Sequence, residues 1–86
     1  MYTVKLTRQA EKTFDHLMKS QPMMGKRIAQ AIDQIAKNPH SGIPLRGDLK
    51  GLFKYRVGVY RLLYSIEKNI LIVTIIDIGH RKEVYR

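Results

Sequence analysis

The stretch 53–64, FKYRVGVYRLLY, constrains the fold of this chain most strongly, because apolar and basic side chains alternate along it. In an extended strand such alternation places the aromatic and aliphatic residues on one face and the basic residues on the other. Gly58 offers a point at which the chain can reverse its direction. We therefore predict a β-hairpin in which Lys54 and Arg56 share one face, joined by Arg61 if the turn keeps it on that side.

The charge of this hairpin is unusual. Residues 50–64 carry four cations and no carboxylate, whereas an exposed strand face more often mixes both signs. The whole chain of 86 residues contains 16 Lys and Arg against 7 Asp and Glu, which gives a formal net charge of +9. Such an excess attracts polyanions and makes nucleic acid the leading class of partner. The alternative is that the basic composition serves only solubility or suits an acidic protein partner.

The first half of the chain has the pattern of a short strand followed by two helices. Residues 2–6 alternate as a strand does, and Thr7 is of a type that caps a helix N-terminus. Apolar residues then recur at helical spacing at positions 10, 14, 17 and 18, and again between positions 24 and 36. Pro22 suits the first turn of the second helix, and Pro39 stops it. Two helices joined so tightly are predicted to form an antiparallel hairpin.

The second half has the pattern of strands. Residues 40–47, HSGIPLRG, are predicted to form a loop because they hold two glycines and a proline. After the hairpin and a turn at 67–69, the apolar run 70–78, ILIVTIIDI, suits a strand buried on both faces and ended by Gly79. The predicted order is β-α-α-β-β-β in a single domain spanning residues 1–86. This is an α+β fold, an antiparallel sheet with the N-terminal helical hairpin packed on one face.

The composition argues against several kinds of site. The chain has no cysteine, and His16, His40 and His80 do not lie at ligand spacing, so no metal site is expected. It has no glycine-rich phosphate loop and no nucleophile elbow around a serine, and no cofactor is expected. The longest apolar run is far shorter than the ~20 residues of a membrane span, and Met1 leads directly into a strand-like segment. We therefore expect a cytoplasmic protein without membrane attachment.

With metal, cofactor and serine-nucleophile sites not expected, the residues left to form a functional site are cations and aromatic rings. Crowding of like charges on the hairpin disfavours the charged form of a lysine, and a lysine drawn towards neutrality can act as a general base. Lys54 is the candidate for this role. The guanidinium groups of Arg56 and Arg61 stay charged and can stabilise a developing phosphorane. Together these groups suit attack by a ribose 2′-hydroxyl on its own phosphate without a metal. A platform that binds phosphates without reacting is the alternative.

The chain end supplies a second set of candidates. After Gly79 the sequence continues as a basic tail, HRKEVYR. Arg81 could support a leaving oxygen, and Tyr85 could stack on a base of single-stranded RNA. Tyr85 could instead seal the edge of the core. His80 is either a simple loop histidine or an acid–base group that acts near neutral pH.

The run LRGDLKGLFKYRVGVYRLLYSI, followed by the apolar strand and the ending IGHRKEVYR, closely resembles the RelE toxins of bacterial and archaeal toxin–antitoxin pairs. The likeness extends from Met1 to Arg86 and includes the β-α-α-β-β-β order, with its specific part in the second half. It implies a ribosome-dependent mRNA endonuclease, or mRNA interferase, that cuts the codon in the ribosomal A site and inhibits translation. The implied reaction is metal-free attack by the 2′-hydroxyl, which leaves a 2′,3′-cyclic phosphate and a 5′-hydroxyl.

The resemblance also implies roles for individual residues. Lys54 falls at the position of the proposed general base, and Arg56 at the next basic position, which binds phosphate or shares the base role. Arg61 matches the arginine that stabilises the transition state. Arg81 matches the proposed general acid, and Tyr85 the aromatic residue that stacks on or orients the mRNA. The further residues expected to contact RNA are Arg46, Lys50, His80 and Lys82.

Partners follow from the same resemblance. The implied antitoxin is RelB-like, a small protein with an acidic and partly disordered segment that folds around the basic surface. The other implied partners are the ribosome and mRNA. Through the antitoxin, the toxin is also expected to join a DNA-binding complex that represses the toxin–antitoxin operon. The chief rival is the related ParE toxins, which share the fold, target DNA gyrase and lack the basic catalytic set. Lys54, Arg61, Arg81 and Tyr85 together favour RelE. A non-catalytic nucleic-acid-binding module or a decayed toxin kept for its antitoxin contacts is a further alternative.

Overall fold

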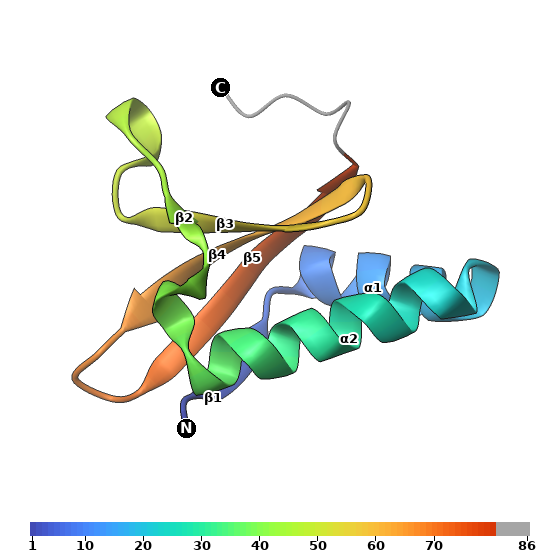
Figure 1. Cartoon of the computed structure of the whole chain (residues 1–86), viewed down its shortest axis with the longest axis horizontal. Helices are drawn as coiled ribbons and strands as arrows, with labels where there is room; N and C mark the ends of the chain where they lie inside the picture. The colour runs from blue at the N-terminus through green and yellow to red at the C-terminus, as the bar shows by residue number, and fades with distance from the viewer. Residues whose placement is uncertain (81–86) are drawn as a thin grey trace.

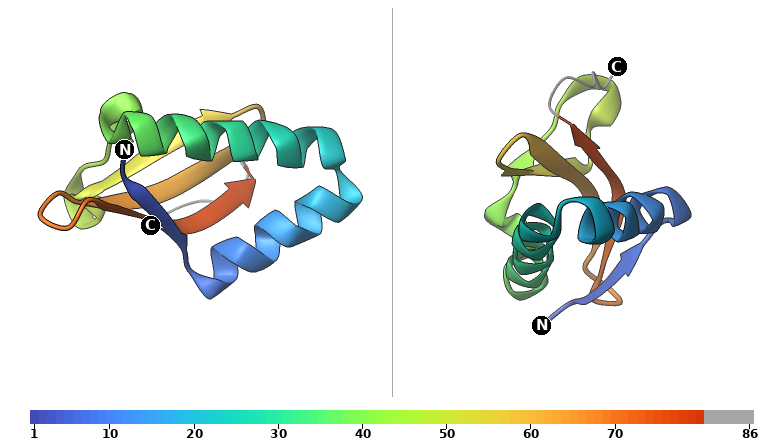
Figure 2. Two further views of the ribbon diagram at one scale, coloured as in Figure 1. Left: turned by 90° about the horizontal axis from the view of Figure 1, so that it is seen from below. Right: turned by 90° about the vertical axis from the view of Figure 1, so that its right-hand side faces the viewer.

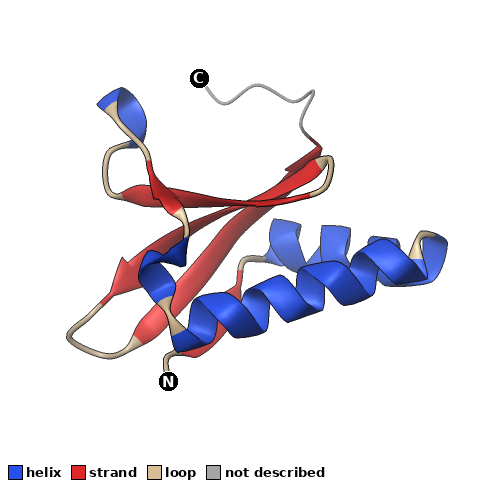
Figure 3. Ribbon diagram, viewed as in Figure 1, coloured by secondary structure: helices blue, strands red, loops and turns tan. Residues whose placement is uncertain are grey.

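The computed structural model describes residues 1–80, in which the helices lie on one face of a five-stranded sheet (Figures 1 and 3). The helices are α1 (Arg8–Ser20) and α2 (Pro22–Lys37). The strands are β1 (Thr3–Leu6), β2 (Ile43–Pro44), β3 (Leu52–Val57), β4 (Tyr60–Glu67) and β5 (Ile72–His80). Short 3₁₀ turns, η1 (Pro39–Ser41) and η2 (Gly47–Leu49), precede and follow β2. The predicted α+β class, with the helical hairpin on one face of the sheet, is confirmed (Figure 2).

The strand order is β1-β5-β4-β3-β2, so β5 lies inside the sheet between β1 and β4. The prediction of a wholly antiparallel sheet is wrong for one pair, because β1 runs parallel to β5, with Val4 opposite Val73. The other pairs are antiparallel, so the sheet is mixed. Most of the chain separates β1 from β5, so no tight turn fixes their relative direction. Side-chain alternation looks the same in a parallel and an antiparallel strand.

Two boundaries in the second half of the chain also differ from prediction. The segment predicted as a loop at 40–47 contains β2, whose Ile43 pairs with Lys54 of β3. The last strand begins at Ile72, two residues later than predicted, because the chain turns through Leu71 with a φ of 55°. It also continues through Gly79, which was predicted to end it, to His80. A glycine near a strand end can stay paired when its neighbour strand supplies the hydrogen bonds, as β4 does here.

The predicted N-cap of the first helix is confirmed and also ties α1 to the sheet. The Oγ1 of Thr7 accepts a hydrogen bond from the backbone N–H of Ala10 at 3.2 Å. The same hydroxyl donates to the carbonyl oxygen of Ile76 in β5 at 2.6 Å. One side chain therefore satisfies a free N–H at the helix start and anchors that start to β5, an interior strand of the sheet.

We expect Thr7→Ala to lower the free energy of unfolding by about 1–2 kcal/mol, because it removes both hydrogen bonds. Thr7→Ser keeps the hydroxyl and should cost much less. Thr13→Ala is the matched control, since among residues 1–80 the Thr13 hydroxyl bonds only to the carbonyl of Gln9 in its own helix. Urea unfolding of the three variants measures the difference. Equal stability of Thr7→Ala and Thr13→Ala would contradict the role of the cap.

The core lies between the helical hairpin and the sheet. The side chains that are at most 2% exposed come from both layers: Ala10, Leu17, Ile28, Ile35, Leu62, Tyr64, Val73 and Ile75. We call the covered side of the sheet the helix-side face. Neither α1 nor α2 is long and apolar enough to span a membrane.

A β-bulge in β5 sets which residues reach this core. Leu63 of β4 pairs with Asp77, but the next residue, Tyr64, pairs with Ile75, so Ile76 is an extra residue in β5. Ile75 before the bulge and Ile78 after it are both buried. Strict alternation from Ile75 would have turned Asp77 towards the helices. The bulge therefore keeps this carboxylate out of the core and on the opposite face.

Candidate functional site

The three basic residues predicted for the hairpin lie on one face of the sheet. In the β3–β4 register Arg56 is directly opposite Arg61, and Lys54 is opposite Leu63. Residues paired in this way point to the same side, so the turn keeps Arg61 with Lys54 and Arg56. Gly58 makes the reversal with a φ of 59°. We call the side of the sheet that carries Lys54, Arg56 and Arg61 the cationic face; it lies opposite the helix-side face.

The cationic face concentrates like charge at close range. Directly opposite residues have Cβ atoms about 4.5–5.5 Å apart, and like charges there are destabilising. Arg56 is exposed, whereas Lys54 and Arg61 are partly buried. Among residues 1–80, the side chains of Lys54 and Arg56 make no hydrogen bond or ion pair. Two cations are therefore available to an anionic ligand, and such a ligand would relieve the repulsion between them and Arg61.

The strand β5 completes this face with Gly79 and Asp77. Gly79 pairs with Arg61. Because glycine has no side chain, Gly79 adds no side-chain atoms beside Arg61 on this face. Asp77 pairs with Leu63 and accepts a hydrogen bond from the Nε2 of Gln9 at 3.1 Å. The sequence did not predict Asp77 as a residue of the cationic face, because strict alternation without the bulge places it on the helix-side face. The face is therefore cationic across β3 and β4 and has a carboxylate at β5.

Two further predicted residues lie on the loop between β2 and β3. Arg46 and Lys50 are exposed and flank η2, which projects from the sheet (Figure 1). The backbone N–H of Lys50 donates to the carbonyl of Gly47 at 3.1 Å, and this bond fixes the turn. Arg46 and Lys50 thus stand at the end of β3 where Leu52 begins, while Arg56 stands near the hairpin turn. The basic residues extend along the whole length of β3.

The structure does not bring His80 onto the cationic face. His80 pairs with Tyr60, and their rings meet edge to face with centroids 5.4 Å apart. Tyr60 alternates with the core residue Leu62 and accepts a hydrogen bond from the Nε2 of Gln21 in the helical hairpin at 3.3 Å. His80 therefore belongs to the helix-side face. Three other predicted residues, Arg81, Lys82 and Tyr85, lie outside the described residues.

A buried tyrosine positions the segment that runs beside Lys54. The hydroxyl of Tyr64 donates to the carbonyl of Pro39 at 2.6 Å and accepts from the N–H of Gly42 at 3.0 Å. Its ring stacks on Phe53 with centroids 5.5 Å apart. A Cβ on Gly42 would collide with the Tyr64 hydroxyl and lie 2.7 Å from the carbonyl oxygen of Lys54. Glycine at position 42 is therefore required for this close approach.

Alternation in the hairpin predicts Tyr64 only as one of its apolar positions. Its hydroxyl partners lie more than 20 residues away, at Pro39, which was predicted to stop the second helix, and at Gly42 in the predicted loop, so no local signal points to them. Burial raises the pKa of the Tyr64 phenol above its ordinary value, which keeps the hydroxyl protonated and able to donate. Tyr64 thus holds the loop against β3 as a neutral group.

Within the described part of the chain, no group of three His, Asp or Glu side chains is placed to hold a metal ion. The chemistry that the cationic face offers is that of one amine and two guanidinium groups in a row. Guanidinium groups bind phosphate oxygens through paired N–H donors, and an amine binds them as a point charge. The arrangement can therefore bind a phosphodiester and stabilise additional negative charge on it.

Comparison with known proteins gives consistent results. The family described as the ParE toxin of the type II toxin–antitoxin system, parDE, matches residues 4–85. Toxin RelG of Mycobacterium tuberculosis is 36% identical, and the alignment covers 99% of this chain and 97% of that protein. A chain of the toxin–antitoxin complex RelBE2 from the same organism superimposes with a TM-score of 0.80 at 34% identity, covering 93% of this chain and 98% of that one. The intact Escherichia coli RelBE complex contains a chain with a TM-score of 0.79 at 15% identity, a likeness of fold alone that covers 96% of this chain and 100% of that one.

Proposed function

The chain belongs to the RelE/ParE superfamily of type II toxins, and from this premise we propose that it is a ribosome-dependent mRNA endonuclease that inhibits translation. The observation that carries the proposal is the shared cationic face, on which Arg56 and Arg61 are directly opposed and Lys54 lies two residues along the same strand. Opposed guanidinium groups cost stability in a domain of this size. A phosphodiester that acquires charge during the reaction offsets this cost.

The proposed reaction begins when a ribose 2′-hydroxyl attacks the adjacent phosphorus atom. The Lys54 side chain acts as a neutral amine, takes the hydroxyl proton and becomes an ammonium group, while Arg56 and Arg61 stabilise the negative charge that develops on the phosphorane oxygens. The bond from phosphorus to the 5′-oxygen then breaks, which leaves a 2′,3′-cyclic phosphate. Arg81 donates the proton that makes the departing oxygen a 5′-hydroxyl, and Tyr85 stacks on a base to align the mRNA. On this proposal Arg46 and Lys50 contact phosphate groups of the mRNA further from the reacting bond.

The proposed partners are an antitoxin and the ribosome, in the cytoplasm. Several solved structures of similar chains are toxin–antitoxin complexes, among them RelBE2 of M. tuberculosis. A RelB-like antitoxin with an acidic segment would complement the net charge of +9. Through that antitoxin the toxin would join a DNA-binding complex that represses its operon.

The test is cleavage of mRNA on programmed ribosomes, mapped by primer extension. We expect the wild type to cut within the A-site codon. Arg81→Ala should reduce the rate about 10²–10⁴-fold, because a general acid contributes that much. Tyr85→Ala should reduce it about 10–100-fold, because stacking on one base contributes about 1–3 kcal/mol. Lys12→Ala, which removes an exposed cation of α1, is the control and should keep full activity.

The match to the ParE toxin family supports a second candidate function, inhibition of DNA gyrase. Intact mRNA in the presence of folded wild-type toxin, together with loss of gyrase supercoiling, would move the assignment to that function. If neither assay responds and the chain still binds RNA, a non-catalytic binding module or a decayed toxin is the better description.

A further inference from the structure

Two neighbouring depressions lie along the edge of β3, and we call them the two lobes of one groove. One lobe, with a volume of about 490 Å³, lies between α2 and β3. The other, of about 380 Å³, lies between β3 and the segment 41–43. Ser41, Tyr55 and Arg56 line both lobes. The two lobes therefore lie next to each other at the strand edge, with these three residues as their common wall.

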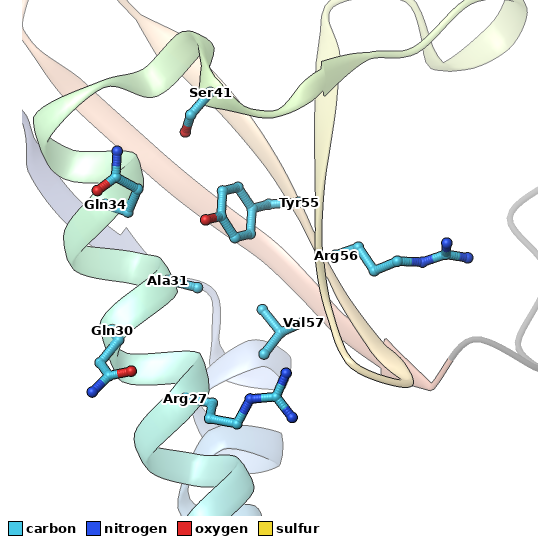
Figure 4. A pocket seen from close by; sticks show the side chains of 8 residues that line it. All are labelled: Arg27, Gln30, Ala31, Gln34, Ser41, Tyr55, Arg56 and Val57. Carbon is cyan, nitrogen blue, oxygen red and sulfur yellow. The ribbon is translucent and has the colours of Figure 1, made fainter.

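The groove exists because β2 is too short to cover β3. Only Phe53 and Lys54 pair with β2, so among the described residues the stretch from Tyr55 to Val57 has a strand neighbour, β4, on one side only. Figure 4 shows Tyr55 and Val57 pointing towards α2, while Arg56 points the other way. The strand edge thus connects the space beside α2 with the cationic face.

The walls of the groove are polar and basic. Gln30 and Gln34 of α2 and Ser41 line the same lobe as Tyr55. Arg27 closes one end, beside the hairpin turn, where a Cβ on Gly58 would lie 3.3 Å from its Nη1. Among residues 1–80, the charged residues that line the two lobes are Arg27, Lys54 and Arg56, and no carboxylate lines either lobe.

This set of groups matches a nucleotide. An aromatic ring offers a stacking surface to a base of any sequence, carboxamides and a hydroxyl bond to base edges, and guanidinium groups bind phosphates. A neutral or basic peptide strand would use the free backbone edge of β3 but would leave three cations unpaired. Charge complementarity therefore favours a polyanion, and the Tyr55 ring among these cations favours single-stranded RNA over an acidic peptide.

We propose that this groove is a nucleotide subsite for single-stranded RNA, occupied by the residue next to the reacting bond. The inference rests on the proposed function and extends its site. Lys54 and Arg56 belong both to the cationic face and to the groove lining. A phosphate held by them leaves the neighbouring nucleotide at the β3 edge, where its base stacks on Tyr55 and its next phosphate lies towards Arg27.

The experiment measures RNA binding separately from cleavage. The probe is a fluorescein-labelled ten-nucleotide RNA in which every ribose carries a 2′-O-methyl group, so that the attacking hydroxyl is blocked. Its affinity is followed by fluorescence anisotropy over a range of salt concentrations. Four variants are compared with the wild type: Arg27→Ala, Tyr55→Ala, Tyr55→Phe and the control Lys12→Ala. Urea unfolding confirms that each variant is folded.

We expect Tyr55→Ala to weaken binding about 10-fold or more through loss of stacking, and Tyr55→Phe to stay within about 2-fold because it keeps the ring. Arg27→Ala, an exposed position that should not affect folding, is expected to weaken binding about 3–10-fold and to reduce the salt slope by about 1. Lys12→Ala removes the same charge outside the groove and should change affinity less than Arg27→Ala.

The proposal is overturned if Arg27→Ala and Tyr55→Ala, both folded, bind the RNA as tightly as the wild type. It is also overturned if those variants lose affinity only for an acidic antitoxin fragment, because the groove would then hold a peptide. Failure of the wild type to bind the probe at low salt has the same consequence. If the wild type leaves mRNA uncut while Arg27→Ala and Tyr55→Ala still weaken RNA binding, the subsite stands and the nuclease proposal falls.

Discussion

Arg61→Ala is expected to lower the rate of mRNA cleavage on the ribosome about 10²–10³-fold, the loss typical when one preorganised charge donor is removed from a reacting centre. Arg61 is held in position by its place in the sheet, directly opposite Arg56 on one side and Gly79 on the other. It is partly buried, and its Nε atom is inaccessible to solvent. A charge held in a partly desolvated site stabilises a phosphorane more than a freely moving surface cation does.

The measurement is a single-turnover rate at saturating toxin, so that chemistry is separated from binding. Arg61→Lys keeps the charge but loses the planar pair of donors, and it should recover only part of the rate. Arg8→Ala removes an exposed arginine at the start of α1 and serves as the charge-matched control. If Arg61→Ala weakens binding but retains the wild-type maximal rate, the cationic face is a phosphate platform and not a reacting centre.

Tyr64→Phe is expected to lower the free energy of unfolding by about 2–4 kcal/mol, because each buried polar group left without its partner costs about 1–3 kcal/mol. The change preserves the ring that stacks on Phe53 and removes only the hydroxyl. The carbonyl of Pro39 and the N–H of Gly42 then lose their hydrogen bonds. Urea unfolding measures the loss. Tyr2→Phe is the control, since the Tyr2 hydroxyl makes no hydrogen bond among residues 1–80.

The pH dependence of stability gives a second readout of the same hydroxyl. Burial raises the pKa of Tyr64 above the value of 10.0 that an exposed tyrosine has. Above that pH the unfolded chain releases this proton first, so the stability contributed by the buried phenol falls as the pH rises. Tyr64→Phe should therefore lose less stability than the wild type between neutral and strongly alkaline pH. The same alkaline loss in both proteins, or an unchanged stability near neutrality, argues against the assigned role.

Local signals in the sequence predicted much of this molecule. The cap at Thr7, the start of α2 at Pro22 and the shared face of Lys54, Arg56 and Arg61 are each determined within a few residues of chain. Alternation in the hairpin is enough to group the three cations once the turn at Gly58 is known.

The features that the sequence did not predict depend on contacts between segments far apart in the chain. The direction of β1 is set by its pairing with β5, and the bulge at Ile76 is defined only by its register with β4. The groove beside Tyr55 arises from the shortness of β2 and the position of α2, which no single stretch of sequence specifies. The roles predicted for Arg81, Lys82 and Tyr85 stay predictions, because these residues lie outside the described part of the chain.

The interior place of β5 has a consequence for biosynthesis. Of the five described strands β5 is the last to be translated, yet it separates β1 from β4 in the finished sheet. Until residues 72–80 have emerged from the ribosome, β1 has no strand to pair with and the helical hairpin cannot bury its apolar side against a complete sheet. A domain generally folds once all the segments that pair with one another have been synthesised. Here the segment that joins β1 to the rest of the sheet is β5, the last described strand. The fold of residues 1–80 is therefore completed only after β5 has emerged, and the pieces made earlier cannot assemble into the sheet by themselves.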